Sequence, residues 1–264
     1  MDFIWNEKTL DWFRTASAYT GFHSELASIV RPRLADCETL CDMGCGLGLL
    51  DLELAKDLRS VLCVDQSEAA IGALRELIRA RGARNIVARV ADVNDASAGE
   101  RWDAVLMSFF GSSLEDIARF LAFCDKRMIL IVHEKATAGR CVNAVSLRPK
   151  PFGAAEVTGF LTGRKLPFQQ THAAIEFGQP FKSLEDARDF IRIYTSSMLE
   201  AAGVGGPAER ERLYGDMESR LVETGRADYP VYLPKPKRIA VFVVEKAAQR
   251  DSARTSPNRK YGIL

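Results

Sequence analysis

Net charge is almost absent from this chain, and histidine is scarce. The 264 residues carry 36 basic and 35 acidic side chains, a formal net charge of +1, and three histidines. Such a balance gives no overall attraction to nucleic acid or to an anionic membrane surface. Apolar runs such as Met128–Val132 are too short to span a bilayer. We therefore expect no membrane partner, and the charge balance disfavours nucleic acid as a partner.

The cysteines form no metal-binding pattern. Cys37, Cys41 and Cys45 are four residues apart, but Cys41 falls in a predicted strand and Cys45 in a glycine loop, so no helix face presents them together. Neither a C-x-x-C nor an H-x-x-x-H pair completes a ligand set, so we predict no metal site and small buried thiols. The first 15 residues lack the apolar block of a secretory signal, which favours a reducing cytoplasm.

What the chain does contain is enough apolar material for one large domain, with 47% hydrophobic and 27% charged residues. Apolar spacing predicts an amphipathic helix over residues 6–31, with Asn6 as its N-cap and Pro32 at its end. From Thr39 onward, short strands alternate with helices, which is typical of βαβ units in a parallel sheet covered on both faces. The predicted class is α/β: a doubly wound, mostly parallel seven-stranded sheet, with an N-terminal helix and a helical insertion before the last strand.

The predicted elements have these bounds. The strands are Thr39–Met43, Ser60–Asp65, Ile86–Val90, Trp102–Met107, Arg127–His133, Thr171–Phe177 and Ile239–Glu245. The later helices are Leu49–Leu58, one from Ser67 to Gly82, one from Ser112 or Ser113 to about Cys124, Ala154–Gly163, one from Ser183 to Gly203, and one from Pro207 to Gly225.

Glycines 44, 46 and 48 follow the first strand and open a helix, which is the setting of a nucleotide-binding loop. A dinucleotide fingerprint would need glycine at position 49, which is Leu49. Asp42 stands two residues before the first glycine, where it would repel a pyrophosphate but not a cationic amine or sulfonium. The loop therefore favours a cationic ligand.

The run from Asp42 to Gly48 matches D-x-G-x-G-x-G, and the chain from about Cys37 to Glu134 resembles the class I S-adenosylmethionine-dependent methyltransferases. That resemblance implies a Rossmann-like fold and S-adenosyl-L-methionine as cofactor. Asp65 ends the second strand, where a carboxylate can accept both ribose hydroxyls. Taken singly, Asp65 could instead cap a helix, and Asp92 could be a turn residue. The full set of cofactor-binding residues that the resemblance implies is Asp42, Gly44, Cys45, Gly46, Gly48, Asp65, Gln66, Asp92, Val93 and Ser108.

The sequence identifies the methyl acceptor less directly than the cofactor. Ser108-Phe109-Phe110-Gly111 stands where related enzymes that methylate base amines carry Asn/Asp-Pro-Pro-Tyr/Phe, and no cysteine is present there for pyrimidine chemistry. By elimination we expect a small organic acceptor, methylated by in-line displacement that depends mainly on orientation. An RNA or protein methyltransferase, or a non-catalytic cofactor-binding sensor or scaffold, remains the alternative.

Three side chains are candidates for catalysis. His133 closes the fifth strand, and Tyr19 and His23 lie on the predicted N-terminal helix. Being four residues apart, Tyr19 and His23 should share one helix face, and we predict that they border the acceptor pocket. A structural role is equally consistent with either histidine. The basic run at 234–238 is interpreted as a solvated loop.

These patterns predict the following organisation. Residues 1–36 form a helical lid, 37–246 the cofactor-binding domain, with a helical substrate cap from 140–238, and 247–264 a flexible tail. A monomer or homodimer is expected.

Overall fold

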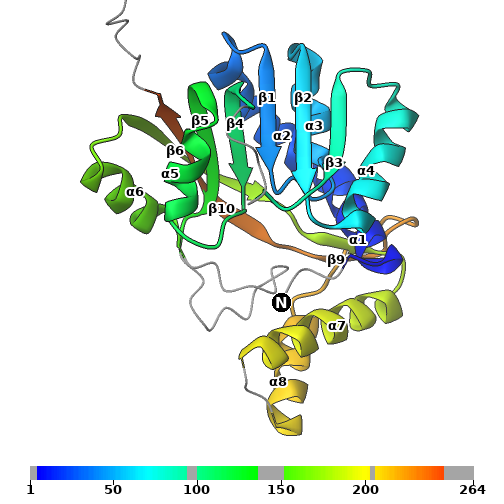
Figure 1. The fold of residues 1–264 in the computed structure, drawn as a ribbon. Coiled ribbons are helices and arrows are strands. Elements are labelled where there is room, and N and C mark those ends of the chain that lie inside the picture. The colour runs from blue at the N-terminus through cyan, green and yellow to red at the C-terminus, as the bar shows by residue number, and fades with distance from the viewer. Residues whose placement is uncertain (1–4, 94–99, 136–151, 203–205, 247–264) are drawn as a thin grey trace, which may run out of the picture.

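A seven-stranded sheet forms the centre of the computed structural model, which describes residues 5–93, 100–135, 152–202 and 206–246 (Figure 1). The strand order is β3-β2-β1-β4-β5-β10-β6. The first five pair in parallel, and β10 is antiparallel to both of its neighbours. This confirms the predicted α/β fold with its mostly parallel sheet. The strands are β1 (Thr39–Met43), β2 (Ser60–Asp65), β3 (Ile86–Val90), β4 (Trp102–Ser108), β5 (Cys124–His133), β6 (Phe168–Glu176) and β10 (Pro236–Glu245).

Helices cover both faces of this sheet, because its central strands are apolar on both sides. One face packs against α2 (Phe22–Val30), α3 (Leu49–Leu54) and α4 (Glu68–Arg81). The other face packs against α5 (Glu115–Leu121) and α6 (Ala154–Gly163). Among the helices of the described ranges, none is long and apolar enough to cross a membrane.

The N-terminal segment is two helices, so the single helix predicted over 6–31 is wrong. α1 (Glu7–Thr20) begins at the predicted cap Asn6, whose side chain accepts the Thr9 N–H. It ends at Gly21, which has a φ of 69°, a left-handed conformation that stops the helix before α2 begins. Because this break lies between Tyr19 and His23, the two side chains do not share a helix face.

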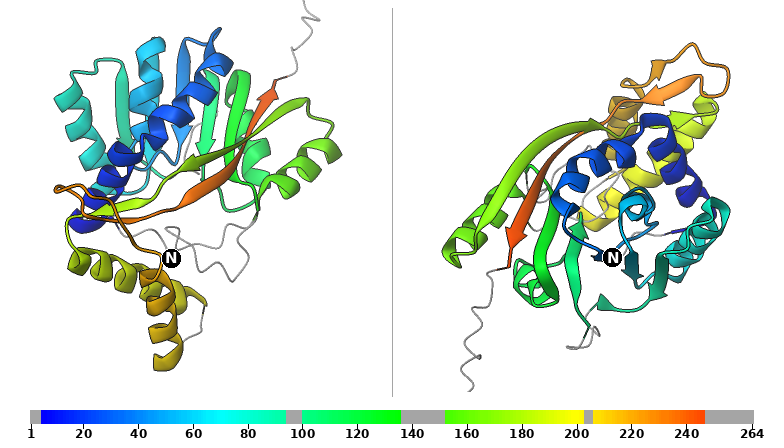
Figure 2. Two further views of the ribbon diagram at one scale, coloured as in Figure 1. Left: turned by 180° about the vertical axis from the view of Figure 1, so that it is seen from behind. Right: turned by 90° about the horizontal axis from the view of Figure 1, so that it is seen from above.

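A second, three-stranded sheet lies beyond the carboxyl edge of the first and was not predicted. Its order is β7 (Gln179–Phe181), β9 (Val231–Leu233), β8 (Val222–Glu223), and it packs with α7 (Leu184–Ala202). Figures 1 and 2 show α7 and α8 (Pro207–Glu218) projecting from that end of the molecule. α8 stops at Glu218 rather than Gly225, since the chain turns into β8.

This second unit shares its core with α1. The Trp12 side chain, 3% exposed, packs edge-on against Phe190 of α7, and its Nε1 donates to Asp186 at 3.1 Å. The segment 140–238, which was predicted to contribute a helical substrate cap, shares this core with α1 and also contains β6 of the main sheet.

The end of α3 and the start of α5 differ from the predictions, and the predicted tail is not described. α3 gives way at Ala55–Asp57 to a 3₁₀ turn rather than running to Leu58. Neither Ser112 nor Ser113 caps α5; instead the Asp116 carboxylate accepts both of their N–H groups. The predicted tail, 247–264, lies outside the described residues.

Gly21 provides a test of the helix break. A Cβ at Gly21 would meet no atom within 4 Å, so Gly21→Ala suffers only from its positive φ and should lose about 1–2 kcal/mol of unfolding free energy. Gly72, inside α4, also has open space around it, so Gly72→Ala should gain about 0.5–1 kcal/mol. Urea unfolding measures both. Equal effects at the two positions would contradict the left-handed break.

Candidate functional site

Four of the predicted site segments meet at one edge of the main sheet. β1, β2, β3 and β4 are parallel neighbours, so the residues that follow their carboxyl ends lie side by side. The register sets Met43 beside Val64, and Asp65 beside Val90. The structure thus brings together the glycine loop (residues 44–48), Asp65, Asp92 and Ser108.

The glycine loop is held to β2 by its own backbone. The N–H groups of Gly44 and Cys45 both donate to the Val64 carbonyl, at 2.8 and 3.0 Å. All three glycines have positive φ, between 55° and 79°. At Gly44 a Cβ would come within 2.1 Å of the Phe110 ring, so only glycine fits there. At Gly46 a Cβ would meet only Trp5 Cζ2, at the ordinary contact distance of 3.6 Å, so the space above this residue is less filled than at Gly44.

Asp65 combines both of the roles considered for it. Its Oδ2 accepts the Gly46 N–H and its Oδ1 accepts the Ser67 N–H, each at 2.9 Å. A carboxylate has about four acceptor positions, so each oxygen retains one for a ribose hydroxyl. The local backbone role is therefore compatible with cofactor binding.

The remaining predicted cofactor residues differ in exposure. Gln66 and Asp92 are exposed at the edge, and Cys45 and Ser108 are half-buried. Val93 is 8% exposed and packs into the core beside α5, so its side chain supports the edge rather than opening onto it.

Asp42 lies beneath the loop, 2% exposed, and its Oδ1 has no hydrogen-bond partner. Burial and the neighbouring Asp51 carboxyl raise the pKa of Asp42 well above its ordinary value. A buried acceptor of this kind, under the glycine loop, suits a ligand with a cationic end. The residues present therefore fit S-adenosylmethionine, whose sulfonium and ammonium are both positive.

An aromatic wall adjoins the glycine loop. It consists of Phe22, Phe109 and Phe177, with the Lys237 ammonium 5.0, 5.0 and 4.1 Å from their ring centroids. Phe109 directly follows β4 and has a φ of 53°. Its neighbour Phe110 lies on Gly44, so two consecutive residues join the wall to the loop.

The three catalytic candidates occupy different surroundings. The His133 ring stacks on Phe109, with centroids 4.8 Å apart, at the end of β5. His23 lies among Phe13, Phe22 and Phe177, and its Nδ1 is 2.6 Å from Ser17 Oγ. Burial, followed by the charge of Lys237, lowers the pKa of His23 to about 3.

Tyr19 stands apart from these two histidines. Its ring packs against Tyr229 and Tyr232 of the second unit, with the Arg226 guanidinium 5.3 Å from its centroid.

Sequence reasoning missed the wall and Asp51. Residues 236–238 were expected in a solvated loop, but they begin β10, and Lys237 packs on three rings. The signal was available, since Lys237 alternates with Ile239 and Val241 on one strand face. Asp51 is likewise visible in the sequence as an acid within an otherwise leucine-rich first turn, Leu49-Leu50-Asp51-Leu52.

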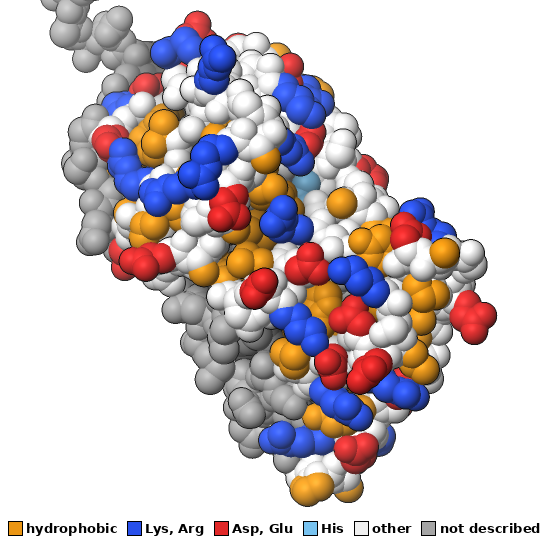
Figure 3. All heavy atoms as spheres, turned by 90° about the vertical axis from the view of Figure 1, so that its right-hand side faces the viewer, with side chains coloured by type: hydrophobic (Ala, Val, Ile, Leu, Met, Phe, Trp, Pro, Cys, Tyr) orange, Lys and Arg blue, Asp and Glu red, His pale blue; other side chains and the backbone are white. Residues whose placement is uncertain are grey.

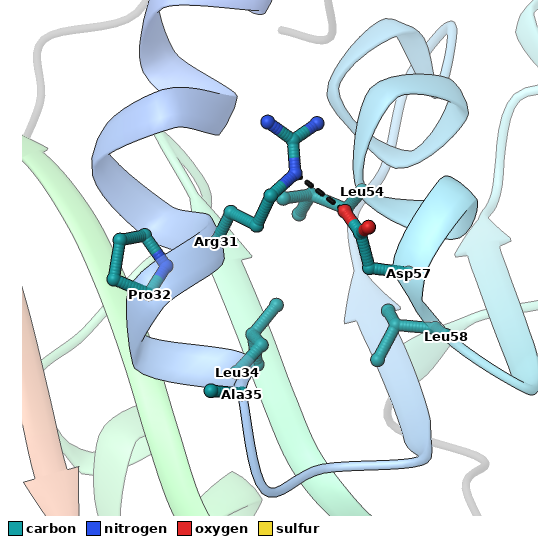
Figure 4. Close-up of a pocket in the computed structure, with 7 residues that line it drawn as sticks. All are labelled: Arg31, Pro32, Leu34, Ala35, Leu54, Asp57 and Leu58. Atoms are coloured by element: carbon teal, nitrogen blue, oxygen red, sulfur yellow. Dashed lines mark hydrogen bonds and ion pairs between the residues drawn. The ribbon is translucent and has the colours of Figure 1, made fainter.

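The cysteines form no metal site in the described part of the chain, and a cleft at the amino edge of the sheet lies away from the glycine loop. Cys37 and Cys41 are buried in opposite cores, and in the described part of the chain no three His, Cys, Asp or Glu side chains are arranged to hold a metal. A cleft of about 300 Å³ opens at the amino edge of the sheet, with the Arg31 Nε–Asp57 Oδ2 ion pair (2.5 Å) across it (Figure 4). Its remaining lining residues are Pro32, Leu34, Ala35, Leu54 and Leu58. It lies at the end of the sheet opposite the glycine loop.

The chain resembles known proteins in one segment of its sequence and in its fold. Residues 40–127 match the family model described as a methyltransferase domain, whereas no curated protein matches the chain. Among solved structures, YcgJ from Bacillus subtilis has 12% identity and a TM-score of 0.56, over 84% of this chain and 99% of that one.

A putative methyltransferase from Bacillus halodurans has 12% identity and a TM-score of 0.52, over 84% and 98% of the two chains. A putative RNA methyltransferase from Pyrococcus horikoshii has 15% identity and a TM-score of 0.50, over 93% of each chain. At these identities the structural matches establish the fold. The methyltransferase-domain match covers the strands and the loop that form the cofactor edge, and the fold agrees with the resemblance to the class I S-adenosylmethionine-dependent methyltransferases.

Proposed function

We propose that this enzyme transfers a methyl group from S-adenosylmethionine to a small organic acceptor that carries an anionic group. The observation that carries this proposal is the aromatic wall with Lys237 beside the glycine loop. Rings provide flat apolar contact for a small acceptor, and the ammonium provides one fixed positive charge. Both stand next to the segment that would hold the cofactor.

Different residues of the chain hold the cofactor and the acceptor. The glycine loop and Asp65 hold the cofactor, Asp92 and Gln66 border its adenine, and Ser108 meets its methionine end. When bound, the cofactor supplies an activated methyl group on a sulfonium. Trp5 and Phe110, which pack on the loop glycines, limit the access of water. Phe109 and Lys237 orient the acceptor.

A small acceptor is preferred over RNA because neither the net charge of the chain nor the face shown in Figure 3 favours a polyanion. On the face shown in Figure 3, acidic and basic side chains lie among one another, and the whole chain has a formal net charge of +1. Arg238 is already paired with Glu134, and Arg226 with Asp228. RNA and protein acceptors are the alternatives, and a methyl-transfer assay distinguishes them from a small acceptor. The five described cysteines are free thiols, which accords with our proposal of a reducing cytoplasm.

If the acceptor must lose a proton, we propose His133 as the base. It lies on the wall at the strand edge, whereas the pKa of His23 is too low for it to take a proton near neutral pH. His23 and Tyr19 then shape the surroundings of the pocket, His23 through Phe177 and Tyr19 through the second sheet.

Removal of the Asp65 carboxylate tests the cofactor site. Asp65→Ala should weaken the binding of S-adenosylmethionine and of its demethylated product by about 1.5–3 kcal/mol, roughly 10- to 150-fold in Kd, because charge-assisted hydrogen bonds are lost. Isothermal titration measures this, with Asp57→Asn, an exposed acid at the opposite edge, as the control. Unchanged affinity in a folded Asp65→Ala protein would place the ribose elsewhere.

The acceptor class is tested by radiolabelled methyl transfer to metabolite, RNA and protein fractions of a cell extract. We expect label in acidic small molecules. With that fraction as substrate, Lys237→Met should raise the acceptor KM about 10-fold or more and leave cofactor affinity unchanged, since one charge-assisted contact is lost. Arg238→Met, the exposed neighbour, is the matched control. Label confined to RNA or protein would overturn the small-acceptor proposal.

Replacement of His133 and of His23 should affect different pH-dependent properties, the first activity and the second stability. His133→Asn should lower kcat by about 10²-fold or more and remove one limb of its pH profile. His23→Asn should leave that profile in place and change stability instead. The folded pKa of His23, about 3, lies below its ordinary 6.5, so stability falls as the pH drops from 6.5 towards 3. Denaturation of His23→Asn across that pH range should show a smaller fall in unfolding free energy than the wild type. An identical fall would refute the lowered pKa of His23.

A further inference from the structure

Two carboxyl groups lie buried together beneath the glycine loop. Asp42 is 2% exposed and Asp51, in the first turn of α3, is 0% exposed. The Oδ1 of Asp42 and both carboxylate oxygens of Asp51 have no hydrogen-bond partner. Ionised carboxylates only accept hydrogen bonds, so two charged neighbours would leave these oxygens unsatisfied at a cost of several kcal/mol. A single proton on the pair would supply the missing donor.

The groups that face this pair are acids and thiols. Cys63 of β2 lies beside Asp42 in the strand register, and Cys45 of the loop contacts Cys63. Asp65, at the end of β2, adds a further negative charge near Asp42. Behind Asp42 on β1 lies the Cys41 thiol, whose pKa is raised in turn. Burial and the charge of Asp65 oppose full ionisation of the pair, whereas the Cys63 thiol lowers the pKa of Asp51, which makes Asp51 the carboxyl that ionises first.

We propose that Asp42 and Asp51 share one proton in the cofactor-free protein, and that their one remaining negative charge is the counter-charge for the cationic end of the cofactor. Asp42 leads directly into the loop, and a charge so far from water is weakly screened. Asp51 acts through Asp42 and is a positioning residue. The inference rests on the cofactor site of the proposed function and adds a proton to it.

Acid should weaken cofactor binding through this pair. Burial raises the pKa of Asp51 to about 6 and holds the pKa of Asp42 well above its ordinary value, and these shifts agree with one proton held by the unpartnered oxygens near neutral pH. Below about pH 6 it takes up a second and becomes neutral, and cofactor binding must then release that proton. Because these folded pKa values lie above the ordinary 3.8, they also make the cofactor-free protein less stable as pH rises from about 4 through 6.

Infrared spectroscopy of the cofactor-free protein tests the shared proton directly. At neutral pH ordinary carboxyls are ionised, so the wild type should show the carbonyl stretch of one protonated carboxyl group. Combined replacement, Asp42→Asn with Asp51→Asn, should remove that band, and Asp57→Asn should keep it. Absence of the band in the wild type, or its survival in the double variant, would overturn the proposal whatever the protein binds.

Calorimetry in buffers of different ionisation enthalpy tests the link to the cofactor. From pH about 7 to about 5.5, wild-type affinity for S-adenosylmethionine should fall about fourfold, the change in the fraction of singly protonated pairs, with net proton release at the lower pH. In Asp51→Asn, an amide N–H donates permanently to Asp42, so both effects should shrink. Asp57→Asn should match the wild type, and the ligand's own titration is common to all three proteins.

Equal pH dependence in the wild type and Asp51→Asn would refute the role of the pair in binding. Failure of the wild type to bind S-adenosylmethionine even at pH 7 would instead count against the cofactor site itself.

Discussion

The carboxylate of Asp65 is the contact on which the site's geometry depends. It accepts one N–H from the turn after β1, at Gly46, and one from the turn after β2, at Ser67. Together with the two bonds from Gly44 and Cys45 to the Val64 carbonyl, it fixes the loop against β2 through the chain's own hydrogen bonds. The loop's positive φ values are thus supported by hydrogen bonds outside the loop, and the cofactor edge is preorganised.

Phe109 and Phe110 extend this fixed edge in two directions. Phe109 faces Phe22, Phe177 and Lys237, whereas Phe110 packs on Gly44 and the opposite core. A phenylalanine at a φ of 53° costs about 1–2 kcal/mol, which the packing of both rings must offset. The turn at Phe109 thereby directs its own ring to the aromatic wall and the ring of Phe110 to the glycine loop.

The features that could be predicted from sequence are those set by neighbouring residues. The strand period, the glycine spacing and Asp65 at a strand end depend on local patterns, and they located the sheet and the loop. β8, with two residues, is too short to show an alternation, so the second sheet could not be found. Lys237 looked solvated because its surroundings come from rings at positions 22, 109 and 177. The pairing of Asp42 with Asp51 likewise requires α3 to fold back over β1.

The sharing of α1 between two cores has a consequence for how the chain assembles. Trp12 completes an apolar cluster whose other members begin at Phe181 and end at Leu233. During synthesis from the N-terminus, this indole must therefore remain without its native neighbours until most of the chain has been made. Contacts over such separations, 174 residues for the bond from Trp12 to Asp186, slow folding and prolong the exposure of apolar surface. The core of the second unit therefore cannot be completed until the chain has been made as far as Leu233, just before the last strand of the main sheet.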